Sequence, residues 1–362
     1  MGYTTRVCRF MRRFKGKCFL LCSLLLWVCT VTAGCAKEHF QSAKGGAAMA
    51  ASSDFTVRTS VREIRQAPAF DGMGDLLLPH AYDIPDGTRL EDLDRCLPWY
   101  TNIRPEMTAA VLNRLRQDGE AGRQVIYPLY SEEEIRRDPT KGRTALVFFR
   151  GMKGARTAVV NAGGGFVYVG AIHDSFPHAL VLSAMGYNVF CPIYRPDAEL
   201  ACEDLSRALI FLFDHAEELG ISMQGYSLWG GSAGARMADW VGTFGTEKFA
   251  GRAVPRPAAV IMAYTGLRDV TGREVPTYSV VGSKDPIADA RVMRHRTQEL
   301  RRCGIDAEIE VFPGLSHGFG VGTGTVAEDW VRRAAGFWER HIGEVRGTGR
   351  DVLDSQEEYE ES

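Results

Sequence analysis

The chain has 362 residues, of which 45% are hydrophobic and 24% are charged, so it has enough apolar material for a large buried core. The formal net charge of -2 gives no support for nucleic acid or an acidic polymer as a partner. Six of the 43 basic residues lie in the first 34 positions, where there is no acidic residue, so the rest of the chain holds 37 basic and 45 acidic residues.

The first 34 residues have the pattern of an export signal. A basic stretch precedes an apolar run of about fourteen residues, which is short for a membrane span and suits a signal-peptide core. The run ends in Thr32-Ala33-Gly34-Cys35, which resembles the bacterial lipobox, although Thr32 stands where a lipobox usually has leucine or a similar aliphatic residue. This resemblance implies that residues 1–34 are a lipoprotein signal peptide and that Cys35 is lipidated. The protein would then be exported and held by its lipid at a membrane, on the periplasmic or outer face of a bacterial envelope. An ordinary secretory signal and an uncleaved anchor are the alternatives.

The segment after the signal offers no catalytic motif. Residues 35–54 are small and polar, as in a flexible tether, and the irregular pattern over 55–144 suggests an N-terminal extension packed on a main domain. Within the extension, a proline in the first turn predicts a helix over 105–117, and Ser131 with Glu134 resembles a capping box.

From residue 145 to 345 the chain alternates between short apolar runs and helical patterns. Strands are expected at 145–150, 157–161, 188–194, 225–229, 258–264, 277–281 and 307–312, and helices at 175–185, 198–219, 233–244, 288–303 and 326–341. A glycine turn over 151–154 predicts a hairpin that joins the first two strands. The alternation implies an α/β fold with a mostly parallel central sheet and helices on both faces. A polar acidic tail is expected over 346–362.

Ser232 is the main candidate for a nucleophile. It lies in Gly230-Gly-Ser-Ala-Gly234, between a strand and a helix, where a strained turn exposes the hydroxyl and small flanking residues let strand and helix approach. The N–H of Ala233 is then available to bind an oxyanion. Such patterns also occur by chance in glycine-rich loops. Ser227 is a competing serine, but it lies inside the strand without flanking glycines.

A second feature is the glycine loop Gly163-Gly164-Gly165, which follows the strand at 157–161. Consecutive glycines let backbone N–H groups point at a carbonyl oxygen that gains negative charge during acyl transfer. A turn of structural use only is the alternative. A phosphate loop is disfavoured because no Gly-Lys-Ser or Gly-Lys-Thr follows.

His317 and Asp285 are the candidates for the base and the acid. His317 lies on a loop at the carboxyl end of a strand, downstream of Ser232, and a neutral imidazole can accept the serine proton. Asp285 follows the preceding strand, and a carboxylate there would hold the imidazole tautomer and stabilise the imidazolium. Asp289 is expected to cap the next helix.

Taken in chain order, these features resemble the α/β-hydrolases over about 145–342, in particular the bacterial esterase and acetyl-esterase branch related to hormone-sensitive lipase. The resemblance implies an α/β-hydrolase fold and a catalytic triad of Ser232, Asp285 and His317. It also implies oxyanion donors at Gly164, Gly165 and Ala233. One position departs from the family, whose loop usually reads His-Gly-Gly-Gly, because this chain has Ala162 in place of the histidine.

The prediction is a serine esterase that uses an acyl-enzyme, acts on a small-molecule ester and needs no cofactor or metal. Short acyl esters, acetyl above all and saccharide esters among them, are the expected substrates, because the link at 265–276 is too short to be the lid of a lipase. Cover for the site must then come from the extension, where Trp99 and Tyr100 could form an aromatic wall, although burial in the core is their expected use. A peptidase of the prolyl-oligopeptidase type is an alternative, but the extension is too short for its propeller and has no repeat. A catalytically silent binding protein on the same fold is another, and the oligomeric state stays open.

Four cysteines lie beyond Cys35 in the chain: Cys96, Cys191, Cys202 and Cys303. They show no CxxC pair and no metal-like spacing with histidine. A Cys191–Cys202 disulfide is conceivable in an exported protein, but buried free thiols are the expected state.

Overall fold

The structure is a computed structural model that describes residues 54–343 except 80–83 and 98. The predicted signal peptide, almost all of the predicted tether and the acidic tail lie outside these residues. The described residues belong to one unit of the chain, 53–362. Within them, no helix is both long and apolar enough to cross a membrane.

Eight strands form one sheet in the order β1-β2-β4-β3-β5-β6-β7-β8. β1 pairs antiparallel with β2, and β2 with β4, whereas every other pair is parallel. Strands β2, β4, β6 and β7 are buried along their whole length, as expected of a sheet that is covered on both faces. The bounds are Ile126–Pro128 (β1), Ala145–Phe149 (β2), Arg156–Asn161 (β3), Asn188–Ile193 (β4), Ser222–Gly231 (β5), Ala259–Ala263 (β6), Thr277–Gly282 (β7) and Ala307–Phe312 (β8).

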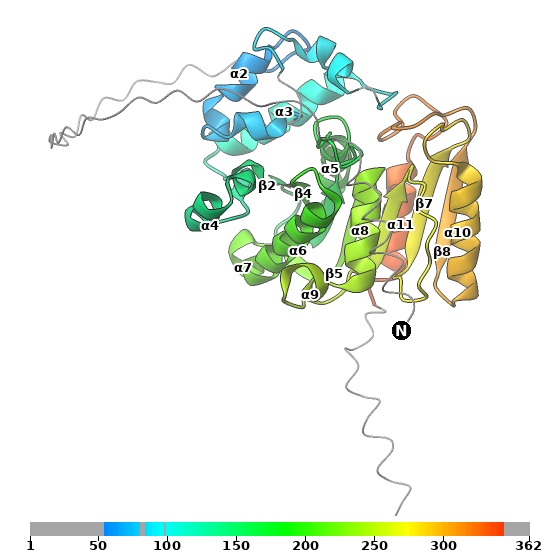
Figure 1. Cartoon of the computed structure of the whole chain (residues 1–362). Coiled ribbons are helices and arrows are strands. Elements are labelled where there is room, and N and C mark those ends of the chain that lie inside the picture. Colours follow the sequence, from blue (N-terminus) through cyan, green and yellow to red (C-terminus); the bar gives the residue numbers. More distant parts are fainter. Residues whose placement is uncertain (1–53, 80–83, 98, 344–362) are drawn as a thin grey trace, which may run out of the picture. The chain divides into compact units, whose positions relative to one another are not determined.

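Helices cover both faces of this sheet (Figure 1). On one face, α5 (Ser175–Ala184) packs against α11 (Trp330–Arg340), and on the other α6 (Ala198–Asp214) packs against α8 (Ala233–Phe244) and the short α9 (Glu247–Ala250). Helix α10 (Ala290–Arg302) packs on β7 and β8. The helix predicted over 198–219 is interrupted at His215, whose backbone leaves the helical region, and a last turn, α7 (Ala216–Leu219), follows.

The predicted hairpin is wrong. β2 and β3 are not neighbours, because β4 lies between them, antiparallel to β2 and parallel to β3. The turn over 151–154 passes beside the start of β4 instead: the Met152 N–H donates to the Gly186 carbonyl at 2.9 Å, and the Gly151 N–H donates to the Asn188 side chain at 3.1 Å. Because β4 lies between β2 and β3, this fully buried strand forms hydrogen bonds along both of its edges, which satisfies its backbone polar groups.

The N-terminal extension is built from short helices and also supplies the edge strand β1. The predicted helix is α3 (Pro105–Glu120), and Ser131 and Glu134 form the predicted capping box at the start of α4 (Glu132–Arg137). The remaining elements are α2 (Val61–Arg65) and short 3-10 helices at Pro68–Phe70, Gly74–Leu77, Leu90–Cys96 and Pro139–Arg143.

The four cysteines in the described part of the chain are free. Cys191 and Cys202 are both buried, as predicted, and burial raises the pKa of each thiol.

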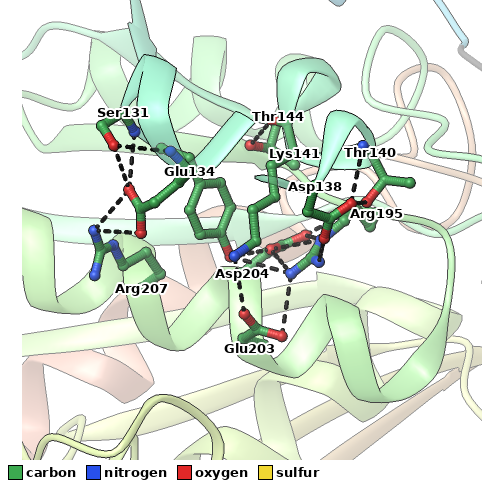
Figure 2. Close-up of polar contacts among 11 residues, drawn as sticks. Ser131, Glu134, Asp138, Thr140, Lys141, Thr144, Arg195, Glu203, Asp204 and Arg207 are labelled. Atoms are coloured by element: carbon green, nitrogen blue, oxygen red, sulfur yellow. Dashed lines mark hydrogen bonds and ion pairs between the residues drawn. The ribbon is translucent and has the colours of Figure 1, made fainter. Parts of the chain in front are cut away.

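A polar cluster joins the extension to α6 (Figure 2). Arg195, just after β4, and Asp204, on α6, are both buried and form an ion pair with an Nη2–Oδ1 distance of 2.6 Å. The Arg195 guanidinium also lies 3.3 Å from Asp138 and 3.2 Å from Glu203. The Tyr130 hydroxyl donates to the Asp204 carboxylate. A buried ion pair is tolerated only when its remaining polar atoms are satisfied, and these partners from the extension and α6 satisfy those of Arg195 and Asp204.

We expect Asp204→Ala to lower the free energy of unfolding by about 3 kcal/mol or more, because Arg195 then keeps a buried charge without its main partner. Glu134→Gln is the matched control. It removes the more exposed ion pair with Arg207, at 3.2 Å, while glutamine preserves the capping box, so its loss should stay below about 1 kcal/mol. Urea unfolding followed by circular dichroism measures both variants, and equal losses would contradict this account.

Candidate active site

Ser232 occupies the sharp turn between β5 and α8. Its backbone has φ 51° and ψ -113°, a strained conformation for a residue with a side chain, and the residue keeps part of its surface exposed. The flanking glycines are required by close packing: a Cβ at Gly230 would lie 2.3 Å from the backbone of Gly234, and a Cβ at Gly234 would lie 2.2 Å from the Asn161 carbonyl. The competing Ser227 is buried, and its hydroxyl accepts a hydrogen bond from the Trp229 indole at 2.7 Å.

His317 lies on the loop after β8, with its side chain almost fully buried. Its Nε2 is 3.0 Å from the Ser232 Oγ, and its Nδ1 is 2.8 Å from the Asp285 Oδ2. The Tyr264 ring packs edge-on against the imidazole, with 5.2 Å between ring centroids. With the proton on Nδ1, the imidazole donates to Asp285 and offers Nε2 as the acceptor for the serine hydroxyl.

Asp285 follows β7, and its side chain is fully buried. The second carboxylate oxygen accepts the backbone N–H groups of Ile287 and Ala288 at 2.8 and 2.7 Å, which fixes the carboxylate plane toward His317. Asp289 does something different: it caps α10 by accepting the Arg291 N–H at 2.8 Å. The structure therefore brings Asp285, and not Asp289, to the histidine.

The glycine loop after β3 lies against the serine. A Cβ at Gly163 would come within 3.0 Å of the Ser232 Cβ. Gly164 and Gly165 have φ of 134° and 63°, which glycine adopts readily and other residues do not. No acceptor within the described residues is assigned to their N–H groups, and the N–H of Ala233, the first residue of α8, has none inside its helix. The three predicted oxyanion donors are thus available beside Ser232.

Asp174 is a buried carboxylate at this site that the sequence analysis missed. Its Oδ2 accepts the Gly163 N–H at 2.6 Å and the Tyr100 hydroxyl at 3.0 Å, and its Oδ1 accepts the Tyr264 hydroxyl at 2.8 Å. Burial and then the Asp174 charge raise the pKa of both phenols well above the ordinary value, so they remain donors. A Cβ at Gly231 would lie 2.5 Å from this carboxylate. Asp174 therefore ties the glycine loop, the serine turn and the residue beside His317 together, although no sequence motif marks it.

Ala162, which replaces the family histidine, is buried at the start of the glycine loop. Its carbonyl accepts the Tyr194 hydroxyl at 2.6 Å. The loop is thus held by Tyr194 and by Asp174, without a side chain from position 162.

The extension reaches the site through Trp99 and Tyr100. Trp99 is 36% exposed, so its predicted burial in the core is wrong. Its ring stacks on Tyr168 with 5.4 Å between centroids, and a Cβ at Gly165 would lie 3.0 Å from it. The next residue but one, Thr101, donates its hydroxyl to the His317 carbonyl at 2.7 Å. The extension therefore places an aromatic ring on the glycine loop and also supports the histidine loop.

The structure bears on the lipidation site and on metal binding only within the residues that it describes. Cys35 lies outside the described residues. Among the residues that the structure does describe, no group of three or more His, Cys, Asp or Glu side chains is arranged to hold a metal ion.

An eight-stranded, mostly parallel sheet with the serine on the β5–α8 turn is the arrangement of the α/β-hydrolase fold. Residues 151–272 match the model of a protein family described as BD-FAE. No curated protein matches the chain.

Several solved structures that are similar to this chain are hydrolases. One is an acetyl ester-xyloside bifunctional hydrolase from Caldicellulosiruptor lactoaceticus, with 21% identity, a TM-score of 0.51, and coverage of 61% of this chain and 97% of that chain. A propionate-bound thermophilic esterase from Thermogutta terrifontis has 19% identity and a TM-score of 0.48, with coverage of 57% of this chain and 92% of that chain. A sugar hydrolase from Lactococcus lactis has 18% identity and a TM-score of 0.48, with coverage of 56% of this chain and 96% of that chain. The predicted fold class is confirmed: the chain has an α/β-hydrolase fold.

Proposed function

We propose that the chain is a serine esterase that hydrolyses short-acyl carboxylic esters through an acyl-enzyme. The observation that carries this proposal is the unbroken row of hydrogen-bonding distances from Asp285 through His317 to Ser232, beside available backbone N–H groups. The match to the BD-FAE family and the description of the Caldicellulosiruptor lactoaceticus enzyme as an acetyl ester-xyloside hydrolase support esters, and acetylated saccharides among them.

In the first half of the reaction, the Nε2 of His317 accepts the Ser232 proton while Oγ attacks the ester carbonyl. The carbonyl oxygen becomes an oxyanion, which the N–H groups of Gly164, Gly165 and Ala233 stabilise. Asp285 stabilises the imidazolium by its charge and its hydrogen bond. When the C–O bond breaks, the imidazolium gives its proton to the departing alcohol, and the acyl group stays on Ser232.

The second half repeats these steps with water. His317 accepts a proton from water as its oxygen attacks the acyl carbonyl, and the same N–H groups hold the oxyanion. Ser232 Oγ then leaves and takes the proton back from His317, which releases the carboxylic acid and restores the site.

We expect acetyl esters to be preferred over long-chain esters. The link between β6 and β7 contains no helix or strand that could form a lid, and the Trp99 ring stands over Gly165, where it restricts the space beside the glycine loop. Each methylene that fails to fit forfeits roughly 0.8 kcal/mol of burial. A series of p-nitrophenyl esters from acetate to palmitate tests this, and a kcat/KM that rises steadily with chain length would favour a lipase.

The same preparation separates the alternatives. Labelling by a fluorophosphonate probe, together with ester turnover, is expected of the esterase. Cleavage of a proline peptide in preference to an acetyl ester would support the peptidase, and failure of both labelling and turnover would support a silent binding protein.

We also propose that Cys35 is the lipidated first residue of the mature protein, which would anchor an exported enzyme at a membrane surface. The basic start, the short apolar core and the small residues before Cys35 support this. Mass spectrometry of the mature N-terminus, produced in a bacterial host with lipoprotein processing, is expected to find an acylated Cys35. An unmodified N-terminus at another residue would refute the proposal.

A further inference from the structure

Arg236 is a partly buried arginine close to the candidate nucleophile. It lies on α8 four residues after Ser232, and its backbone N–H points to the Ser232 carbonyl at 3.4 Å. Residues four apart share a helix face, and helical side chains lean toward the helix N-terminus, which here is the end that carries Ser232. The long side chain of Arg236 is therefore directed toward the carboxyl edge of the sheet.

The guanidinium reaches the loops that build the site. A Cβ at Gly266, in the loop after β6, would lie 3.7 Å from the Arg236 Nη2 and 3.7 Å from the Ile287 carbonyl oxygen. Ile287 belongs to the loop that fixes the Asp285 carboxylate. Farther along the same helix face, Trp240 stacks on Phe166, the residue after the glycine loop, with 6.1 Å between ring centroids. Arg236 thus lies along α8 between Ser232 and the Phe166–Trp240 pair.

The Arg236 side chain has no hydrogen bond or ion pair with any described residue. Burial lowers its pKa, and Asp269, the one charge that opposes this effect, lies beyond ion-pair distance. The Arg236 nitrogen atoms remain accessible to solvent. The neighbouring Thr265 hydroxyl, in contrast, is buried without a hydrogen-bond partner. A guanidinium has five donors and is costly to bury unpaired, so an anion would find both charge and donors here.

The surrounding loops carry charges of both signs, because the exposed Asp269 follows Arg268 in the loop after β6. Arg268, after β6, and Lys284, beside Asp285, are exposed, and neither has an ion-pair partner among the described residues. Two other carboxylates of these loops are already engaged: Asp285 with His317 and Asp289 with Arg291.

We propose that Arg236 binds a carboxylate carried by the substrate, so that the esters preferred at Ser232 are those with a negatively charged group near the scissile bond. This inference rests on the proposed esterase function. The carboxylate can belong to the alcohol half or to the acyl half of the ester, and both halves present the same chemistry to a guanidinium.

Two pairs of esters distinguish the halves. For the alcohol half, 4-acetoxybenzoate is compared with its neutral methyl ester, and for the acyl half, monoethyl malonate is compared with diethyl malonate. For the wild type and for Arg236→Met, kcat/KM of the anionic ester is divided by kcat/KM of the neutral ester. Comparing this ratio between the two proteins cancels the difference in intrinsic reactivity between the two esters. We expect Arg236→Met to lower the ratio by about tenfold or more in one pair, and Arg236→Lys to restore part of it.

Arg302→Met is the matched control. Arg302 is the last residue of α10, pairs with Glu299 on the surface and is exposed, so its ratios should equal those of the wild type. Thermal unfolding of all variants shows whether they fold. Unchanged ratios in Arg236→Met for both pairs would overturn the inference while leaving the esterase intact.

Failure of the esterase function gives a different result. If the wild type hydrolyses none of the four esters, the proposed function fails, and calorimetry with the uncleavable 4-acetamidobenzoate still decides the role of Arg236. Binding that weakens about tenfold in Arg236→Met supports the carboxylate site, and equal or absent binding refutes it.

Discussion

Ser232→Ala is expected to abolish ester turnover, with a loss in kcat of about 10⁶-fold, while the protein folds as the wild type does. The hydroxyl that disappears is the one that His317 Nε2 faces at 3.0 Å, and the neighbouring oxyanion donors cannot form an acyl-enzyme by themselves. The measurement is the turnover of p-nitrophenyl acetate in parallel with fluorophosphonate labelling.

Stability supplies the control for this variant. Ser232 adopts φ 51°, so alanine inherits the same backbone strain, and its partly exposed hydroxyl contributes little packing. The unfolding midpoint should therefore stay close to that of the wild type. Ser227→Ala, which alters the buried competing serine, should keep turnover. Substantial activity in a pure Ser232→Ala preparation would mean that another residue is the nucleophile.

The second large effect is expected for Asp285→Asn, with a loss in kcat of about a thousandfold or more. An amide in place of the carboxylate can present its NH₂ group to His317 and favour the tautomer that has its proton on Nε2, where it cannot accept from Ser232. It also removes the charge that stabilises the imidazolium.

Asp289→Asn is the matched control for this prediction, because it makes the same chemical change four residues away. Asp289 caps α10 and pairs with the exposed Arg291, and asparagine is an equally good N-cap. Turnover should change little. If the Asp289 variant lost more activity than the Asp285 variant, the acid would have to be reassigned.

Many of the helices and strands can be predicted from short stretches of sequence. The β8 strand and the α8 helix fall where the local pattern predicts them, because apolar runs, glycine stops and proline starts act within about ten residues. The serine turn is only partly local, because Gly230 is required by the helix that follows it, whereas Gly234 is required by the Asn161 carbonyl of the distant strand β3.

Strand order could not be read in this way. The glycine turn between β2 and β3 looks like a hairpin because it reverses the chain, but the partner of each strand depends on where the buried β4 arrives from farther along the sequence. Trp99 shows the same limit. Its aromatic character predicts burial, yet the surface it covers, Gly165 and Tyr168, is assembled by the fold.

The strand–helix alternation could be predicted from the sequence, and so could the serine motif and the candidates for base and acid, because each is recognised from adjacent residues. The roles that depend on distant partners became visible only in the fold. Asp174 acquires its place from hydroxyls 74 and 90 residues away. Arg236 becomes notable only because its side chain has no hydrogen bond or ion pair with a described residue. Hydrogen bonds and charges act through space, over a few ångströms that sequence separation does not encode.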